Sequence, residues 1–368
     1  MRTIISKSQI KVMCDENIPL LAESLISCAE VITFKGRELR NSDLIENNCR
    51  ALIVRSTTKI NADLLEGTAV EFVGTATSGT DHIDLDYLNI NKIQFADAPG
   101  SNANSVAELV VYSAIRYAEM IGESLRGKTI GIIGFGNIGK IVAKYAHNFE
   151  MNILINDPPL LDEKYSFPDY VTNTDIDTLC SESDILTNHV PLTKYGQYPT
   201  YGLLNAERIN SMKQGALLIH SSRGFVVEEK PLIRRLKSKS LYASVDVWEN
   251  EPLINPELVR LVFHASPHVG GYSRDGKLKG TMMMIKAFAA YSGLTPNTEA
   301  IDDELKSYKA VQAKKYSDAD YIVNLLQEKR QFEADDKAMR EMIDTPIEDR
   351  PGTFDMLRKK YPVRRESL

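Results

Sequence analysis

Short apolar runs rich in β-branched residues alternate with helical patterns along most of the chain. Strands that alternate with helices predict α/β layers built on largely parallel sheets. Polar loops rich in Gly, Asp, Ser and Thr follow the first runs, and open α/β sheets place their ligands at such loops. The first predicted strands are Ile10–Cys14, Ala51–Arg55, Phe72–Thr77 and Ile93–Ala98.

A long helix is predicted to begin near Ser105. Ser105 and Glu108 have the S-x-x-E spacing of a capping box, in which each side chain binds an unpaired backbone N–H of the first turn. Apolar residues then recur at intervals of three and four up to Ile121, which indicates one buried face. Because this helix lies between two α/β segments, we expect it to connect two domains.

A second series of strands and helices follows the long helix. Its first unit is the strand Thr129–Gly134, the helix Asn137–Phe149 and the strand Met151–Asp157. After Leu294 the chain is dense in charge, helix-prone and poor in β-branched runs, which indicates a small third domain. The other predicted strands are Ile185–His189, Ala216–His220, Ala243–Val247 and Val262–Ala265, and the other predicted helices are Ala206–Lys213, Glu228–Lys237 and Lys277–Tyr291.

A glycine-rich turn joins the first strand of this second series to its helix. Residues 134–139 read G-x-G-x-x-G, and Asp157 ends the next strand eighteen residues later. In a dinucleotide site the glycines allow the turn, the approach of a pyrophosphate and the packing of helix on strand, while the acidic residue binds a ribose hydroxyl. A carboxylate at this place repels a 2′-phosphate, so NAD is favoured over NADP. The expected cofactor contacts are Gly134, Gly136, Asn137, Ile138, Gly139 and Asp157.

Three later strands each end in a polar residue that suits hydride transfer. Arg223, Glu251 and His268 follow the predicted strands that begin at positions 216, 243 and 262. The carboxyl ends of parallel strands share one edge, so these side chains are expected to converge beside the dinucleotide. A histidine can take the proton of a 2-hydroxy acid while hydride leaves the same carbon, and a carboxylate can orient its ring. An arginine can bind the substrate carboxylate with its planar fork.

Other histidines have simpler interpretations. His264 and His268 are four residues apart, which is a metal-ligand spacing, but Pro267 lies between them and prevents a regular helix. We therefore expect no metal site. His189 and His220 lie in apolar strand patterns and are expected to be core or strand-end residues, and the role of His82 stays open.

Composition excludes several classes of protein. The chain has 368 residues and a net charge of −6, from 44 Lys and Arg against 50 Asp and Glu. A mildly acidic chain is a poor non-specific binder of nucleic acid or anionic membranes. Its four cysteines are scattered, with no C-x-x-C spacing, so neither a disulfide scaffold nor a zinc module is expected. We expect a cytoplasmic protein.

These motifs resemble those of the D-isomer-specific 2-hydroxyacid dehydrogenase family. The resemblance implies that Arg223, Glu251 and His268 are catalytic, with His268 as the acid/base. It implies two doubly wound parallel-sheet domains, one for substrate and one Rossmann domain for NAD, and a small C-terminal α+β dimerisation domain. The matching pieces are 134–139, 222–224, 246–252 and 267–271.

Within that family the chain looks most like the branch that oxidises a phosphorylated four-carbon 2-hydroxy acid in pyridoxal 5′-phosphate biosynthesis. The branch implies a homodimer, NAD contacts at Asp246 and Gly271, and substrate contacts at Ser56, Thr77 and Tyr272. Val190 stands where the branch has a threonine that contacts NAD. The segments behind this narrower likeness are 15–17, 54–59, 72–82, 98–100, 157–159, 271–272 and 351–361.

The implied domains are residues 1–104 with 265–296 for substrate, 105–264 for NAD and 297–368 for dimerisation. Arg55, beside Ser56, is a candidate for the substrate phosphate. The clustering of Arg364 and Arg365 in the dimerisation segment suggests that Arg364 or Arg365 reaches a partner subunit's site. Two alternatives stay open: a dehydrogenase for another 2-hydroxy acid, such as 3-phosphoglycerate, and an NAD-sensing binding protein on the same fold.

Overall fold

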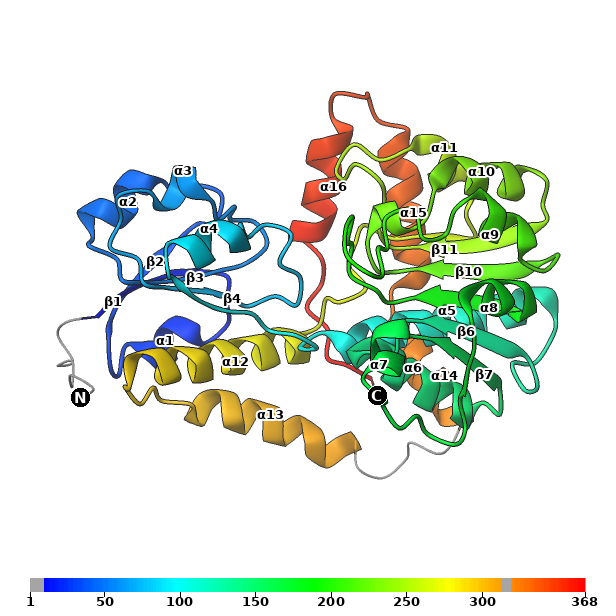
Figure 1. Cartoon of the computed structure of the whole chain (residues 1–368), viewed down its shortest axis with the longest axis horizontal. Coiled ribbons are helices and arrows are strands. Elements are labelled where there is room, and N and C mark those ends of the chain that lie inside the picture. Colours follow the sequence, from blue (N-terminus) through cyan, green and yellow to red (C-terminus); the bar gives the residue numbers. More distant parts are fainter. Residues whose placement is uncertain (1–9, 313–318, 368) are drawn as a thin grey trace. The chain divides into compact units, whose positions relative to one another are not determined.

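The computed structural model describes residues 10–312 and 319–367 (Figure 1). These residues form two units, each with its own parallel sheet. Residues 10–102 and 273–312 make the first unit, and residues 103–272 and 319–367 make the second. The two α/β domains expected from the alternation of strands and helices are therefore confirmed.

The sheet of the first unit has five parallel strands in the order β2-β1-β3-β4-β5. Helices cover both of its faces, as the βαβ connection of parallel strands requires. The strands are β1 Lys11–Asp15, β2 Glu30–Phe34, β3 Ala51–Val54, β4 Phe72–Thr75 and β5 Gln94–Ala96. The helices are α1 Leu21–Leu25, α2 Asn41–Glu46, α3 Ala62–Leu65, α4 Leu85–Ile90, α12 Arg274–Ser292 and α13 Glu299–Gln312.

Alternate residues of these strands enter two different cores, because successive side chains of a strand point to opposite faces. Ile53 packs in the core that α1 and α12 cover, whereas Leu52 packs in the core under α2, α3 and α4. Both residues are completely buried. The strands are thus buried on both faces, which explains why their sequences read as continuous apolar runs.

The sheet of the second unit has seven parallel strands in the order β12-β11-β10-β9-β6-β7-β8. This is the Rossmann strand order extended by one strand. Successive strands are added toward one edge of the sheet from β6 to β8 and toward the other edge from β9 to β12, so the order reverses between β6 and β9. The strands are β6 Thr129–Ile133, β7 Asn152–Asn156, β8 Thr172–Asn173, β9 Ile185–Asn188, β10 Ala216–His220, β11 Leu241–Val245 and β12 His264–Ala265.

Two helical layers cover the second sheet. One core contains residues of α5 and α6, and the other contains residues of α8 to α11 together with α15. The helices are α5 Ala103–Ile121, α6 Asn137–Asn148, α7 Pro158–Asp162, α8 Ile176–Glu182, α9 Ala206–Ser211, α10 Glu229–Lys237, α11 Pro256–Leu261, α14 Ala319–Lys329, α15 Phe332–Ile343 and α16 Arg350–Lys359, with a 3-10 turn at Gly224–Val226.

The predicted strands are observed with shifts of a few residues at their ends. β2 was not predicted, and its residues are mostly half-exposed, which weakens the apolar signal of an edge strand. β11 begins two residues before the predicted start at Ala243. In the described residues, no helix is long and apolar enough to cross a membrane.

The segment expected as a third domain, 297–368, is divided between the two units. Its residues up to 312 belong to the first unit, and those from 319 belong to the second. Residues 313–318 and 368 lie outside the described part. Within the part that is described, this segment forms helices α13 to α16 and no strand, so its expected α+β character is not met there.

The expected capping box at Ser105 is wrong, because both of its side chains have other partners. The helix α5 begins earlier, at Ala103, and the Ser105 hydroxyl donates to the Gly270 carbonyl oxygen at 2.7 Å. Glu108 is fully buried and accepts from Arg364 Nη1 at 2.8 Å. Arg364 Nη2 also donates to Ser105 Oγ at 2.6 Å. Distant residues of the same unit therefore use the groups that a capping box would have used.

A second arginine completes this buried cluster. Arg330 Nη2 lies 3.7 Å from Glu108 Oε2, and the Arg330 side chain is 2% exposed. One carboxylate thus compensates two buried guanidinium groups. Arg364, which was expected to reach a partner subunit, is instead held inside its own chain.

Removal of the Glu108 carboxylate should destabilise the protein strongly. Glu108→Ala leaves Arg330 and Arg364 buried without their counter-charge, and loss of one partner of a buried ion pair costs about 3–5 kcal/mol. Urea denaturation measures the free energy of unfolding. Glu119→Ala is the matched control on the same helix, because Glu119 pairs with Arg116 at the surface, and a change within about 1 kcal/mol is expected. Equal effects of the two substitutions would refute the buried-pair argument.

Candidate active site

The glycine-rich turn between β6 and α6 has the geometry of a dinucleotide site. Gly134 has a φ of +89°, and a Cβ there would lie 3.0 Å from the His189 carbonyl oxygen. A Cβ at Gly139 would collide with the Gly134 carbonyl oxygen. Gly136 is exposed, and a Cβ there would have no atom within 4 Å. Two glycines are therefore required by packing, and the middle one leaves its backbone open to a ligand.

The carboxylate of Asp157 lies at this turn, as the motif predicts. Its Oδ2 accepts from the Phe135 N–H at 2.7 Å, and its Oδ1 accepts from the Leu160 N–H at 3.1 Å. Asp157 thereby caps α7 and ties the end of β7 to the glycine turn. Val190, just beyond β9, faces Gly134, since its Cγ1 would lie 3.1 Å from a Cβ there.

NAD fits these residues. The exposed start of α6, at Gly136 and Asn137, offers backbone N–H groups and the positive end of a helix dipole to a pyrophosphate. Ile138 is half-buried on the same first turn. Asp157 stands where a ribose hydroxyl would donate, and its negative charge disfavours a 2′-phosphate.

The second predicted feature is the pair of His268 and Glu251. His268 Nδ1 lies 2.8 Å from Glu251 Oε2, and both side chains are partly buried. Burial alone would raise the pKa of Glu251, but the charge of His268, its hydrogen bond and the Trp248 N–H together hold that pKa below its usual range. The carboxylate is therefore ionised at neutral pH and accepts from the histidine ring.

The backbone of His268 is held in an uncommon conformation. Its φ is +57°, in the left-handed region that few residues other than glycine adopt. The buried carboxylate of Asp246 fixes the surrounding loop, because it accepts from Ser266 Oγ at 2.6 Å and from the N–H groups of Val269 and Gly270 at 2.9 and 3.0 Å. The following residue, Gly271, is half-buried. The fold thus imposes the orientation of the histidine.

Arg223 follows β10 and lies next to the loop that carries Glu251. A Cβ on Gly224 would collide with the backbone of Trp248, so the two loops are in backbone contact. The half-buried Arg223 donates from Nη1 to the Ser222 carbonyl oxygen at 2.8 Å. Loops after β10, β11 and β12 therefore meet at one edge of the sheet, as predicted.

His220, the last residue of β10, contacts the end of β9 and the loop that follows β10. Its Nε2 lies 3.3 Å from the Gly224 carbonyl oxygen, and its Nδ1 lies 3.2 Å from Asn188 Oδ1. Burial lowers the pKa of His220 to about 4. The charge of Glu251 raises this pKa and the charge of His268 lowers it, but burial has the largest effect. His220 is a buried, neutral strand-end residue, which confirms the expectation for it.

His189 and His264 are also buried histidines. Burial lowers the pKa of each to about 3. His264 stacks on Phe332 with 3.5 Å between ring centroids, and its Nδ1 lies 3.1 Å from Ser244 Oγ. His264 therefore belongs to the core rather than to a shared site with His268.

A pair of glutamates that no sequence motif marks also supports this edge of the sheet. The Glu249 N–H donates to Glu229 Oε1 at 3.1 Å, and the Glu229 N–H donates to Glu249 Oε1 at 3.3 Å. This exchange anchors the loop two residues before Glu251. Two glutamates 20 positions apart give no sequence signal, because the contact exists only after β10 and β11 have paired.

The predicted substrate residues of the first unit lie at strand ends. Ser56 is exposed in the loop after β3. Thr77 follows β4, and its hydroxyl lies 2.8 Å from Thr75 Oγ1, which lies 2.9 Å from His82 Nε2. His82 thus supports the β4 loop. Arg55 Nε lies 3.3 Å from Asp15 Oδ1.

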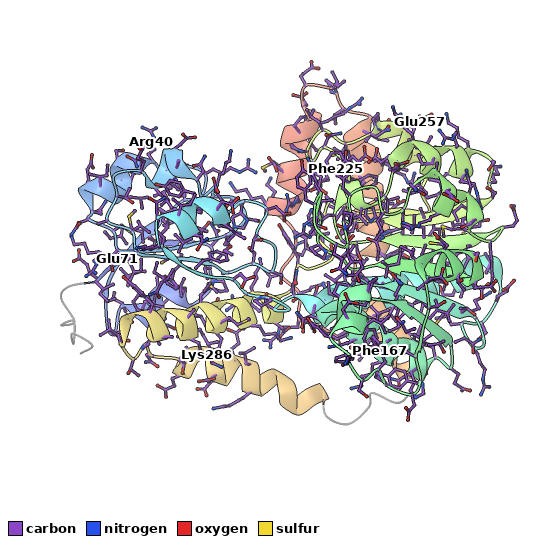
Figure 2. All side chains as sticks on the ribbon, viewed as in Figure 1. Arg40, Glu71, Phe167, Phe225, Glu257 and Lys286 are labelled. Atoms are coloured by element: carbon purple, nitrogen blue, oxygen red, sulfur yellow. The ribbon has the colours of Figure 1, made fainter. Side chains whose placement is uncertain are left out.

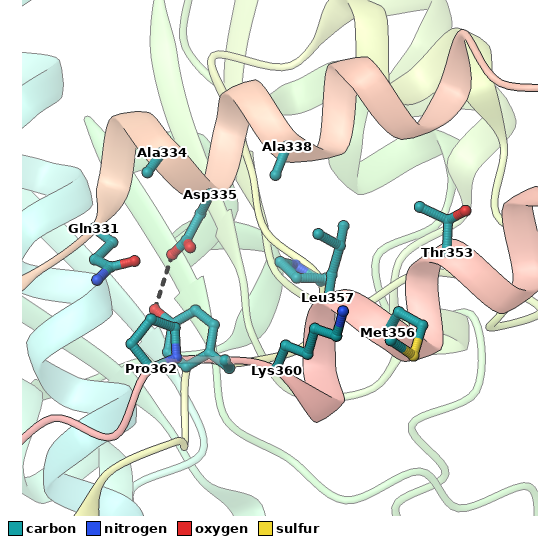
Figure 3. A pocket seen from close by; sticks show the side chains of 11 residues that line it. Gln331, Ala334, Asp335, Ala338, Thr353, Met356, Leu357, Lys360 and Pro362 are labelled. Atoms are coloured by element: carbon teal, nitrogen blue, oxygen red, sulfur yellow. Dashed lines mark hydrogen bonds between the residues drawn. The ribbon is translucent and has the colours of Figure 1, made fainter.

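The remaining predicted substrate residue, Tyr272, belongs to the second unit. Its ring makes an edge contact with Tyr361, with 5.9 Å between centroids. Tyr361 also lines a hollow of about 340 Å³ that lies between α15 and α16 and reaches Pro267, next to His268 (Figure 3). The Tyr361 hydroxyl donates to Asp335 Oδ2 in this hollow at 3.0 Å.

Comparison with known proteins defines the class first. Residues 102–270 match the model of the D-isomer specific 2-hydroxyacid dehydrogenase, NAD binding domain, and residues 305–367 match a domain of unknown function, DUF3410. Erythronate-4-phosphate dehydrogenase of Proteus mirabilis is 37% identical over 362 residues, which cover 97% of this chain and 93% of that protein. The chain belongs to the erythronate-4-phosphate dehydrogenase family, within the D-isomer specific 2-hydroxyacid dehydrogenases, and the resemblance noted in its motifs is confirmed.

Two further matches agree with this placement. The protein of the same name from Chromohalobacter salexigens is 41% identical over 286 residues, which cover 77% of this chain and 73% of that protein. The NAD⁺-bound 3-phosphoglycerate dehydrogenase of Entamoeba histolytica has a TM-score of 0.64 at 26% identity, covering 77% of this chain and 95% of that one. The protein has an NAD-binding domain and is an oxidoreductase.

Substitution of Gly136 should separate cofactor binding from stability. Gly136→Ala adds a Cβ in open space, so the melting temperature should stay within about 2 °C, but the methyl group obstructs a pyrophosphate and should weaken NAD binding at least about tenfold. NADH fluorescence titration measures the affinity. Gly139→Ala is the contrasting variant, and overpacking against Gly134 should cost it about 1–3 kcal/mol. Wild-type NAD affinity in Gly136→Ala would contradict the assigned site.

The stability of the second unit should depend on pH through Asp335. Burial, aided by the charge of Asp246, raises the pKa of Asp335 to about 7 despite the Tyr361 hydrogen bond. The folded state therefore holds a proton that the unfolded chain has released, and this contribution is lost as pH rises through about 7. Between pH 6 and 8, wild type should lose on the order of 1 kcal/mol relative to Asp335→Asn. Urea denaturation of both proteins at pH 6 and pH 8 measures this change. If the difference in free energy of unfolding between wild type and Asp335→Asn is the same at both pH values, the assignment is contradicted.

Proposed function

We propose that this protein oxidises 4-phospho-D-erythronate with NAD, giving 3-hydroxy-2-oxo-4-phosphooxybutanoate and NADH, in pyridoxal 5′-phosphate biosynthesis. The substrate name comes from the relatives that span nearly the whole chain. The observation that carries the chemistry is the 2.8 Å pair of His268 and Glu251 on the sheet that also bears the glycine turn. An imidazole oriented by a carboxylate is the acid/base that oxidation of a secondary alcohol needs.

His268 is the proposed catalytic base. Ionised Glu251 accepts from the Nδ1 side of the ring, so the lone pair of a neutral imidazole is at Nε2, where it can take the substrate hydroxyl proton. As that proton leaves, the C–H electron pair departs as hydride and the C–O bond becomes a carbonyl. When bound, NAD supplies the acceptor for this hydride. The imidazolium that forms is stabilised by the adjacent carboxylate of Glu251.

Arg223 is the proposed ligand of the substrate carboxylate. A guanidinium binds a carboxylate through two parallel N–H donors and stays charged at any working pH. Its loop is in backbone contact with the loop of Glu251, which supports a place beside the acid/base pair. Its positive charge also stabilises the negative charge that grows on the reacting oxygen.

The remaining assignments are proposals of the same kind. Gly134, Gly136, Asn137, Ile138, Gly139 and Asp157 hold NAD together with Val190, Asp246 and Gly271. Because both oxygens of Asp246 already accept from the His268 loop, its main part in cofactor binding is to shape that loop. Ser56, Thr77, Tyr272 and Arg55 bind substrate.

We also propose a cytoplasmic homodimer. Exposed apolar side chains in the C-terminal segment, Ile347, Met356 and Val363, support a subunit interface there, and sedimentation equilibrium measures the assembly directly. No disulfide joins the four cysteines, which lie in the described residues and are all buried, as suits a reducing compartment. The proposed domains are 1–104 with 265–296, 105–264 and 297–368. In the structure, residues 103–104 and 265–272 group with the NAD-binding unit, and 297–368 is divided between the two units.

Loss of the acid/base should abolish most turnover. NADH absorbance is followed against a panel of D-2-hydroxy acids that includes 4-phosphoerythronate and 3-phosphoglycerate. Wild type should prefer 4-phosphoerythronate, and His268→Ala should lower kcat by about 10²-fold or more. His147→Ala, at an exposed histidine near the end of α6, is the matched control and should keep full kcat.

Either of two results would defeat this proposal. Activity retained by His268→Ala would remove the assigned role of the histidine. NAD-dependent association with another protein, without product from any acid of the panel, would favour the sensing function instead.

A further inference from the structure

The last described residues form an irregular tail that enters the interior of the second unit. After α16 ends at Lys359, residues 361–367 have no helix or strand, and we call them the C-terminal tail (Figure 1; Figure 2). Arg364, Glu366 and Ser367 are nevertheless buried. Because buried polar groups need partners that replace water, specific contacts must hold this tail in place.

One contact of the tail reaches the loop that carries His268 through a serine of α5. Arg364 Nη2 donates to Ser105 Oγ at 2.6 Å, and the Ser105 hydroxyl donates to the Gly270 carbonyl oxygen at 2.7 Å. A hydroxyl has a single proton to donate, so the bond from Arg364 leaves that proton for Gly270. Arg364 thus orients a hydrogen bond to the backbone two residues after His268.

The buried carboxylate of Glu108 fixes Arg364 in this orientation. Arg364 Nη1 donates to Glu108 Oε2 at 2.8 Å, and the Ser367 N–H donates to Glu108 Oε1. Arg364 Nη1 also donates to the carbonyl oxygen of Arg365 at 3.3 Å. Both ends of the guanidinium fork are therefore held, one on Glu108 and the other on Ser105.

Another contact of the tail lies at the end of the same loop. The ring of Tyr361 packs edge-on against the ring of Tyr272, with 5.9 Å between centroids and 86° between ring planes. The Tyr272 N–H donates to the Val269 carbonyl oxygen at 2.8 Å, which closes a turn that contains Gly270. The tail therefore supports this turn at two points, the Gly270 carbonyl oxygen and the Tyr272 ring.

The loop needs support because His268 has a φ of +57°. This conformation is costly for a residue other than glycine and persists only where the surroundings impose it. Asp246 holds N–H groups of the loop, whereas Ser105 and Arg330 donate to its Gly270 carbonyl oxygen. Loss of either set of contacts should let the histidine move away from its position beside Glu251.

We propose that Arg364 and Tyr361 of the C-terminal tail are positioning residues for the acid/base His268. Arg364 acts through Ser105 and Gly270, and Tyr361 acts through Tyr272. Both belong to the DUF3410 segment, which thereby takes part in the chemistry of the active site. The inference rests on the proposed function for the role of His268 in the reaction.

The test measures a rate constant that does not depend on how much of the enzyme is folded. NAD-loaded enzyme in excess over 4-phosphoerythronate gives a single turnover, which NADH absorbance follows. Arg364→Ala should lower this rate constant at least about tenfold, because small displacements of a catalytic group are costly. Glu108 keeps Arg330 as its counter-charge in this variant. A merely structural role would lower the stability and leave the single-turnover rate constant unchanged, which would overturn the proposal.

Lys359→Ala is the matched control, because it removes an exposed positive charge at the end of α16, just before the tail. Its single-turnover rate constant should stay within about twofold of wild type. An equal fall in Lys359→Ala and Arg364→Ala would show that the effect does not depend on the buried contact, and the proposal would fail.

Tyr361 provides a second test with a conservative variant. Tyr361→Phe keeps the ring against Tyr272 and should keep most of the single-turnover rate constant, whereas Tyr361→Ala removes the ring and should lower the rate constant about tenfold. If Arg364→Ala does not fold, this pair of variants decides the proposal. Equal rate constants for Tyr361→Phe and Tyr361→Ala would overturn it.

A spectroscopic measurement keeps this inference separate from the proposed function. The proton in the hydrogen bond between His268 Nδ1 and Glu251 should give a downfield NMR resonance, identified by its absence in His268→Ala. Arg364→Ala and Tyr361→Ala should shift or remove this resonance, and Tyr361→Phe and Lys359→Ala should not.

The two hypotheses can then fail independently. If wild type does not oxidise 4-phosphoerythronate, the proposed function falls, yet the resonance still decides whether the tail positions His268. A resonance that is unchanged in both Arg364→Ala and Tyr361→Ala would overturn the positioning role whatever the activity shows.

Discussion

The parallel direction of the strands is the constraint on which the proposed chemistry depends. Because every strand of a parallel sheet ends on the same edge, side chains far apart in sequence are brought to one place without any local motif. The loops after β10, β11 and β12 meet in this way, and they carry Arg223, Glu251 and His268. The same constraint in the first unit brings Arg55 beside Asp15.

Buried carboxylates then fix what the sheet brings together. Asp246 accepts three hydrogen bonds from the loop that carries His268, which holds that residue at a positive φ. Glu108 pairs with Arg330 and Arg364, and Ser105 Oγ and Arg330 Nη2 donate to the carbonyl oxygen of Gly270, two residues after His268. Hydrogen bonds between buried polar groups rigidify their surroundings. The loop that carries His268 is therefore held by buried contacts with Asp246 and with the cluster around Glu108, rather than by solvent-exposed contacts.

The sequence was sufficient for most of the strands and for the glycine turn, because each has a local signature, and it correctly placed Arg223, Glu251 and His268 beyond the ends of three strands. The buried strands are continuous apolar runs, and the turn has fixed glycine spacing. It was insufficient wherever a side chain's partner is distant. Ser105 and Glu108 have the spacing of a cap, but Arg364 and Gly270 compete for them more than 150 residues away.

The surroundings of each arginine decide which one can serve a ligand. Arg364 and Arg330 are almost completely buried against Glu108, and separating such a pair costs about 3–5 kcal/mol. A charge-assisted hydrogen bond to a ligand returns only about 1.5–3 kcal/mol, so these arginines stay where they are. Arg55 and Arg223 are both partly exposed, and Arg55 Nε lies 3.3 Å from Asp15 Oδ1. Both guanidinium groups are therefore accessible to a ligand, which their proposed roles require.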